Sequence, residues 1–209
     1  NELKIKVAVE KSEKRDIIEV ITANGKVQPE TEVKISPEVS GEIVELNVKE
    51  GDYVQKGDLL IKIRPDNYIS ILNGAEASVN SAKARLKQTE ARLIQSKQDF
   101  ERNKSLWEQK AISEAEFELV SSAYSSALAE KDAANYAVES ALAYMKEAQE
   151  NLRKTSIYAP MKGTVSMLNV ELGERVLGTN MMTGTEMLRI ADLNRMEVEV
   201  EVNENDIVK

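Results

Sequence analysis

The chain contains neither cysteine nor histidine among its 209 residues. These absences exclude disulfides and thiol nucleophiles, and they remove the usual zinc ligands and the most common general base. Aromatic residues are scarce at 4 %, and no run of roughly 18 apolar residues exists that could cross a membrane as a helix. The net charge of −8 comes without a basic cluster, which argues against nucleic acid as a partner. Composition therefore favours a binding or assembly protein over an enzyme.

The chain is rich in charge, at 31 % of residues, and in heptad periodicity. Between residues 67 and 155, apolar and small residues recur at alternating steps of three and four, a pattern typical of helices that pair through their a and d positions. The a positions are mostly large and the d positions mostly small, which predicts two closely packed antiparallel helices. Each helix spans about 60 Å, and the turn between them falls near residues 110–113.

We call the a and d positions of these repeats the seam. In the first helix the seam comprises Leu72, Ala75, Val79, Ala82, Leu86, Thr89, Leu93, Ser96, Phe100, Asn103 and Trp107. In the second helix it comprises Phe117, Val120, Tyr124, Ala127, Lys131, Ala134, Val138, Ala141, Met145, Ala148, Leu152 and Thr155.

Residues 112–117 predict the start of the second helix. Ser113 followed by Glu116 is a capping box, in which the hydroxyl accepts a backbone N–H of the first turn and the carboxylate reaches back to the cap residue. Ile112 and Phe117 are placed to form a hydrophobic staple across the same turn. The second helix is therefore expected to begin at Glu114.

Two strand-rich segments flank the predicted helices. Residues 3–35 alternate apolar and polar side chains, which predicts strands, with turn-like breaks at residues 11–15 and at Asn24–Gly25. Residues 39–63 and 159–190 contain short strands separated by glycines, and they match each other as an internal repeat. The repeat aligns Gly41 with Gly163, Ile43 with Val165, Asn47 with Asn169, Gly51 with Gly173 and Val54 with Val176.

Neither half of the repeat has enough apolar residues to bury a core alone. The two halves are therefore expected to clasp each other as one small β-sandwich or flattened barrel, with the helical hairpin inserted between them.

The halves resemble those of biotinyl and lipoyl carrier domains. Their division by a coiled-coil hairpin resembles the periplasmic adaptor subunits (membrane fusion proteins, HlyD-like family) of tripartite efflux pumps, of the RND or the macrolide-exporter type. Near the turn, Arg102, Leu106 and Ser113 match the spacing of the arginine–leucine–serine motif with which these adaptors contact the outer-membrane channel. The resemblance therefore implies a docking site at the hairpin tip.

The resemblance implies an α+β fold: a split lipoyl/biotinyl-like β-domain, an inserted antiparallel coiled-coil hairpin, and strands of an incomplete β-barrel domain. We expect the division to be N-terminal barrel or membrane-proximal strands in 1–35, the first lipoyl-like half in 36–66, the hairpin in 67–155, the second half in 156–193 and the start of the barrel in 194–209.

As function, the resemblance implies a homo-hexameric periplasmic sheath that links an inner-membrane transporter of RND or ABC type to an outer-membrane channel of TolC type. No cofactor and no catalysis are expected. The chain begins at Asn1 without a leader, and the resemblance implies anchoring to the inner membrane of a Gram-negative bacterium by a segment that this sequence does not contain.

Two other classes of function stay open. A biotin or lipoyl carrier would modify Lys162, which follows Met161 as in carrier domains, although the position of the carrier hairpin is occupied here by the helical insertion. A coiled-coil spacer or adhesin would have no transport role. In that case Arg102 is a solvated helix charge, and Ser113 is only a helix cap.

Overall fold

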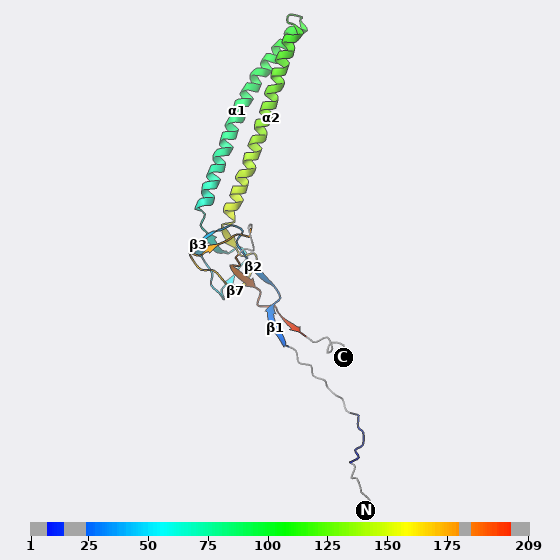
Figure 1. The fold of residues 1–209 in the computed structure, drawn as a ribbon, viewed down its shortest axis with the longest axis vertical. Coiled ribbons are helices and arrows are strands. Elements are labelled where there is room, and N and C mark those ends of the chain that lie inside the picture. Colours follow the sequence, from blue (N-terminus) through cyan, green and yellow to red (C-terminus); the bar gives the residue numbers. More distant parts are fainter. Residues whose placement is uncertain (1–7, 15–23, 180–184, 202–209) are drawn as a thin grey trace, which may run out of the picture.

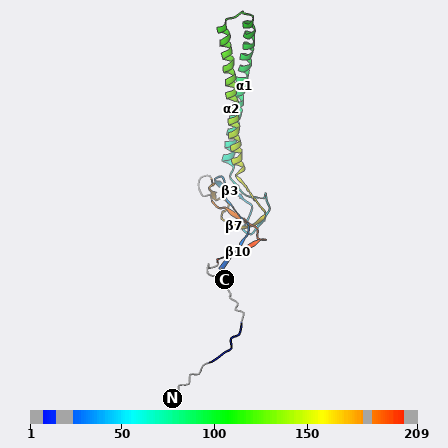
Figure 2. The ribbon, with the colours of Figure 1, turned by 90° about the vertical axis from the view of Figure 1, so that its right-hand side faces the viewer.

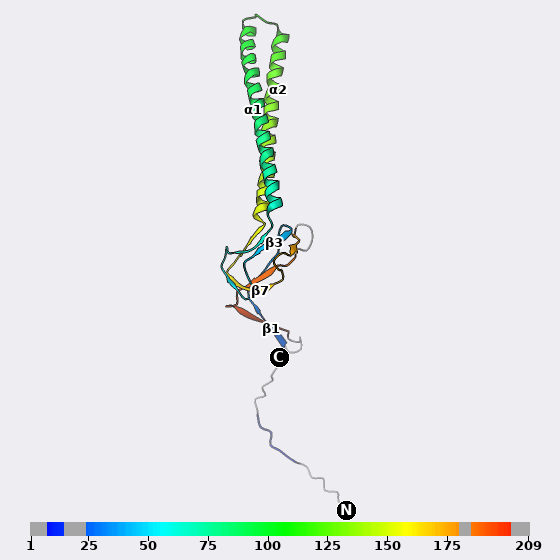
Figure 3. The same cartoon turned by 90° about the vertical axis from the view of Figure 1, so that its left-hand side faces the viewer.

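The computed structural model describes residues 8–14, 24–179 and 185–201. A helical hairpin, a small β-sandwich and a two-stranded ribbon follow one another along the long axis of the molecule (Figure 1). Two further views (Figures 2 and 3) show the same arrangement from the sides, with the hairpin and the ribbon on opposite sides of the sandwich. Within the described residues, neither helix combines the length and the apolar character that crossing a membrane requires.

The hairpin is formed by α1 (Asp66–Glu108) and α2 (Glu114–Arg153), which confirms the predicted antiparallel pair. Every seam side chain is buried or half-buried apart from Trp107, which remains 41 % exposed. The alternation of large and small residues explains how α1 and α2 pack closely together, since Ala127 and Ala134 are almost fully buried. Thr155 lies beyond the end of α2, where its hydroxyl donates a hydrogen bond to the carbonyl of Leu152.

The sandwich consists of two four-stranded sheets, and each sheet takes two strands from each half of the repeat. One sheet has the order β2-β9-β7-β4 and the other the order β6-β5-β3-β8. The first half contributes β2 (Glu32–Ile35), β3 (Gly41–Leu46), β4 (Tyr53–Val54) and β5 (Leu59–Ile63). The second half contributes β6 (Ser156–Tyr158), β7 (Gly163–Leu168), β8 (Arg175–Val176) and β9 (Leu188–Ala191).

The repeat produces an internal symmetry in the backbone hydrogen bonds. Gly51 N–H donates to the carbonyl of Val165 at 2.9 Å, and the equivalent Gly173 N–H donates to the carbonyl of Ile43 at 2.9 Å. Both glycines have a positive φ, of 92° and 88°, which a side chain would disfavour at these turns. The fully buried core side chains come from both halves: Ile43, Leu60, Ile61, Ile63, Val165, Val176, Leu188 and Ile190. The two halves therefore fold as one unit, as expected.

Two local expectations need correction. Asn24–Gly25, predicted as a turn, lies inside β1 (Asn24–Pro29), which pairs antiparallel with β10 (Met196–Glu201). The glycine allows close approach instead, because a Cβ on Gly25 would lie 2.8 Å from the carbonyl oxygen of Glu199. Residues 8–14, with Val9, form no strand, while residues 3–7 and 18–21 lie outside the described residues.

The pairing of β2 bears on the division of the chain. Val33 of β2 is opposite Ile190 of β9, so Glu32–Ile35 belongs to the sandwich and not to the N-terminal segment in which the sequence pattern placed it. The ribbon of β1 and β10 comprises strands that the sequence assigned to the barrel.

We expect Ala134→Leu to lower the free energy of unfolding by about 1–3 kcal/mol, because the larger side chain overpacks the seam. Ala134 is 5 % exposed. Ala129→Leu makes the same change on the exposed side of α2 and is the control. Thermal unfolding followed by circular dichroism would measure both, and equal melting temperatures for the two variants would contradict the packing.

We also expect the sandwich to fold without the hairpin. Lys62 of β5 is opposite Ser156 of β6, and Ile63 N–H donates to the carbonyl of Thr155 at 2.8 Å, so a short turn can replace residues 66–153. The deletion variant should show a β-sheet circular dichroism spectrum and unfold cooperatively. Removing β6 as well should abolish that transition, and a random-coil spectrum for the first variant would contradict the split domain.

Candidate functional site

The tip of the hairpin begins where α1 is terminated by its own backbone. Ala111 N–H donates to the carbonyl of Leu106, and Lys110 N–H donates to the carbonyl of Trp107, both at 2.8 Å. This pair of bonds is a Schellman motif, which requires a left-handed residue after the helix. Lys110 supplies it with a φ of 57°. The chain reverses within residues 109–113, so the tip is short and closely defined.

The start of α2 has the capping box that the sequence predicts. Glu116 N–H donates to Ser113 Oγ at 3.3 Å, and Ser113 N–H donates to the Glu116 carboxylate at 3.0 Å. The Ser113 hydroxyl also donates to the same carboxylate at 3.0 Å. The backbone N–H of Ser113, more than its hydroxyl, lowers the pKa of Glu116 from its ordinary value of 4.5.

An aromatic cluster supports the tip from below. The ring of Trp107 stacks on Phe117 with a centroid distance of 4.9 Å, and Phe100 contacts Phe117 at 5.6 Å and Tyr124 at 5.2 Å. These contacts connect the last turns of α1 with the first turns of α2. Trp107 therefore packs against the partner helix, as its seam position indicated, and the cluster fixes the ends of both helices around the reversal.

The three residues of the spacing motif all lie at this end of the hairpin and reach solvent. Arg102 has a 68 % exposed side chain and forms an ion pair with Asp99 at 3.5 Å. Leu106 is 36 % exposed, and Ser113 is exposed beyond the reversal. Because Arg102 and Leu106 are four residues apart, they lie on the same face of α1. The tip thus presents hydrogen-bond donors, an apolar side chain and a helix N-terminus together.

Leu119 is a tip residue that the sequence reasoning missed. It lies in the second turn of α2 and is 74 % exposed, more than any other large apolar side chain reported for the described part of the hairpin. The available signal was its place outside the heptad seam, a property that Leu119 shares with Leu106.

The hypothesis that the chain is a biotin or lipoyl carrier depends on where Lys162 lies. This lysine is exposed in the bend between β6 and β7, whereas the connection between the two halves, from β5 to β6, holds the whole helical hairpin. Among the described residues, no group of three or more aspartates and glutamates could hold a metal ion.

A split lipoyl-like sandwich that carries a long coiled-coil hairpin is an architecture shared with a known protein family. Residues 31–184 match the sequence model of the family described as "RND MFP, barrel-sandwich hybrid domain", where MFP stands for membrane fusion protein. The chain belongs to this family.

Several named relatives have similar sequences. The chain is 26 % identical over 193 residues to the macrolide export protein MacA of Escherichia coli O157:H7, which covers 92 % of this chain and 52 % of MacA. It is 32 % identical over 194 residues to the pyoverdine export membrane fusion protein PvdR of Pseudomonas putida, and this match covers 93 % of the present chain and 49 % of PvdR. The chain spans about half the length of the curated relatives it matches.

Solved structures show the same fold. The crystal structure of MacA from Actinobacillus actinomycetemcomitans superposes with a TM-score of 0.84 at 31 % identity, covering 90 % of this chain and 58 % of that one. A MacA–MexA chimera that contains the α-hairpin domain of Pseudomonas aeruginosa MexA gives a TM-score of 0.50, also at 31 % identity, covering 90 % and 57 %.

We expect Ser113→Ala to destabilise the first turn of α2 by about 0.5–2 kcal/mol, because it removes the cap. Ser113→Thr keeps the hydroxyl and is the matched control. Native-state hydrogen exchange of the amides in this turn would measure the change. Equal protection in Ser113→Ala and the unaltered chain would show that the capping box is dispensable.

The same cap should respond to pH. The pKa of Glu116 is lower in the folded protein than its ordinary value of 4.5. The stability that the Glu116 carboxylate gives to the first turn of α2 is therefore complete above pH 4.5 and is lost as the pH falls through the lowered pKa. The protection factors of the amides in the first turn of α2, which are corrected for the intrinsic pH dependence of exchange, should therefore fall on acidification, and Glu116→Gln should remove this fall.

Proposed function

We propose that this chain acts as a periplasmic adaptor of an efflux pump. In this proposal six copies pack side by side into a channel-like sheath that extends from an inner-membrane transporter of RND or ABC type. The hairpin tips contact an outer-membrane channel of TolC type. The adaptor is anchored to the inner membrane of a Gram-negative bacterium, and the transporter supplies the energy.

The observation that carries the proposal is the exposed tip at the end of a long, narrow rod. The helices contain 43 and 40 residues, so the rod holds Arg102, Leu106 and Ser113 about 60 Å from the sandwich. A globular core needs no such extension. The hairpin tip can therefore reach the proposed outer-membrane channel while the sandwich remains beside the proposed inner-membrane transporter.

The comparisons support export as the process. The names of MacA and PvdR refer to export of a macrolide and of pyoverdine, which are both small molecules. The superposition is closer on MacA than on the chimera with the MexA hairpin, with TM-scores of 0.84 and 0.50. The hairpin and the sandwich taken together are therefore arranged more as in that MacA structure than as in the chimera.

Leu106→Asp should abolish binding to the outer-membrane channel and export, because it places a charge in the apolar contact of the tip. Ile94→Asp makes the same kind of change on α1, at a side chain that is 59 % exposed, and should leave both intact. Channel pull-down, export in a strain that lacks the adaptor, and thermal unfolding should be measured for both variants. If Leu106→Asp still binds the channel and restores export, the tip has no docking role and the rod is only a spacer.

A further inference from the structure

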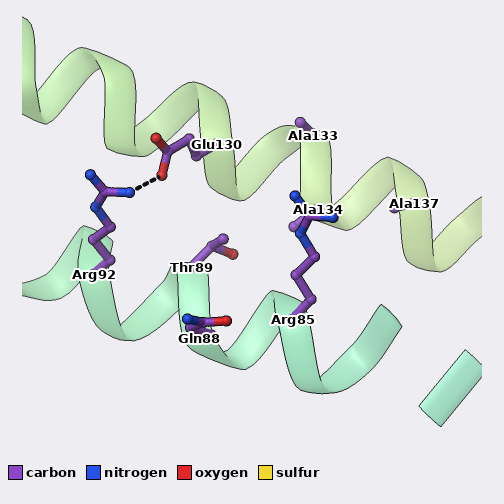
Figure 4. A pocket seen from close by; sticks show the side chains of 8 residues that line it. All are labelled: Arg85, Gln88, Thr89, Arg92, Glu130, Ala133, Ala134 and Ala137. Carbon is purple, nitrogen blue, oxygen red and sulfur yellow. Dashed lines mark hydrogen bonds and ion pairs between the residues drawn. The ribbon is translucent and has the colours of Figure 1, made fainter. Parts of the chain in front are cut away.

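A groove of about 510 Å³ runs along one side of the hairpin between α1 and α2 (Figure 4). Its floor consists of small side chains, Ala133, Ala134 and Ala137 of α2, so the groove is open to a large side chain from outside. Arg85 and Arg92 of α1 line the opposite edge. Figure 4 shows both arginines extending from α1 across toward α2.

The two arginines differ in their pairing. Arg92 forms an ion pair with Glu130 across the hairpin at 2.8 Å. Within the part of the chain that the structure describes, Arg85 has no ion-pair or hydrogen-bond partner, although its side chain is exposed at the groove. The groove therefore offers an unneutralised guanidinium beside an alanine floor, which suits an acidic side chain flanked by apolar ones.

A complementary surface exists on the other side of α2. Its residues recur at alternating steps of four and three, the spacing of a second heptad stripe, and we call them the flank: Leu128, Asp132, Asn135, Glu139 and Leu142. All five are exposed, with Leu128 at 41 % and Leu142 at 38 %. The flank is therefore polar in its middle and apolar at both ends. Asp132 accepts an ion pair from Lys131 at 3.3 Å, whereas Glu139 has no partner among the described residues.

The groove and the flank point in opposite directions. Glu139 lies two residues beyond Ala137 of the groove, and Asp132 lies two residues beyond Glu130, so each acidic residue is turned by about 200° around the helix axis from its groove neighbour. Two different surfaces on opposite sides of one chain can join identical copies head to tail, and such contacts close into a ring when the rotation between neighbouring copies is a whole fraction of a turn.

The groove and the flank also match in height along the rod. The Arg92–Glu130 ion pair places these two residues at one level, and one heptad further from the tip Arg85 lies level with Ala137. Along the helix axis, Glu139 is then about 3 Å from the level of Arg85, and Asp132 is about 3 Å from the level of Arg92. Copies in a ring are related by rotation alone, so groups of equal height meet.

We propose that the flank of one copy packs into the groove of the next copy. Arg85 pairs with Glu139 of the neighbouring copy and Arg92 with its Asp132. The inference rests on the side-by-side assembly proposed above, and it assigns the surfaces and the register by which hairpins associate.

Cysteine cross-linking tests this contact cleanly, because the chain has no cysteine of its own. The full chain with both Gln88→Cys and Asn135→Cys places one thiol in the groove and one on the flank at the same level. Mild oxidation should give a ladder of disulfide-linked dimers and larger species. The control combines Lys87→Cys with Asn135→Cys. Lys87 is adjacent in sequence but is turned away from the groove by about 100°, so this variant should remain monomeric on a denaturing gel.

Charge reversal tests the pairing itself. Arg85→Glu and Glu139→Arg should each weaken self-association by about tenfold, because each creates a like-charge contact. The double variant should associate normally, and so should an equal mixture of the two single variants, in which both kinds of contact are again of opposite charge. Lys87→Glu reverses a charge at the same height outside the contact and should have no effect. Analytical ultracentrifugation would measure all five samples.

The outcomes separate this inference from the proposed function. If the chain assembles but the thiols at positions 88 and 135 do not cross-link, or the double variant is not restored, the groove contact is wrong and side-by-side assembly stands. If the unaltered chain stays monomeric at all concentrations and the thiols at positions 88 and 135 do not cross-link, both proposals fail. Loss of channel binding in Leu106→Asp with cross-linking intact would locate that defect at the tip alone.

Discussion

The pairing of β5 with β6 is the constraint on which the rest of the molecule depends. These strands come from the two halves of the repeat, and the hydrogen bond from Ile63 N–H to the carbonyl of Thr155 closes the sheet where the helices leave it. It holds the base of α1 beside the base of α2, so the coiled coil begins in register. Because loop-closure entropy grows slowly with length, an insertion of this size costs the sandwich little.

The rod is stabilised along its length by the seam and at its end by local backbone bonds. Alanines at the d positions bring the helices close, and the aromatic cluster around Phe117 joins them below the reversal. Since the sandwich lies at the far end, the proposed docking residues Arg102 and Leu106 can be changed without disturbing the β core. The same separation leaves both sides of the rod free for neighbouring hairpins.

Much of the fold follows from patterns that act over short distances. The heptads and the Ser113 capping box depend on residues within a few helical turns, so they predict the helices. The glycine-marked segments are similar to each other in sequence, so they predict the split domain. Asn24–Gly25 shows the limit of such patterns. An Asn–Gly pair favours a turn when adjacent strands pair with each other, but β1 pairs with a strand from the far end of the chain.

The sequence by itself determined the hairpin, its turn and the dependence of each β half on the other, because these features are encoded by side-chain periodicity and by cap chemistry. Only the tertiary structure decided which strands share a sheet, that β2 joins the sandwich, and that Arg85 borders an alanine-floored groove with Glu139 on the opposite side. The physical reason is that strand partners and surface grooves depend on contacts between residues far apart in the chain, and no local pattern specifies those contacts.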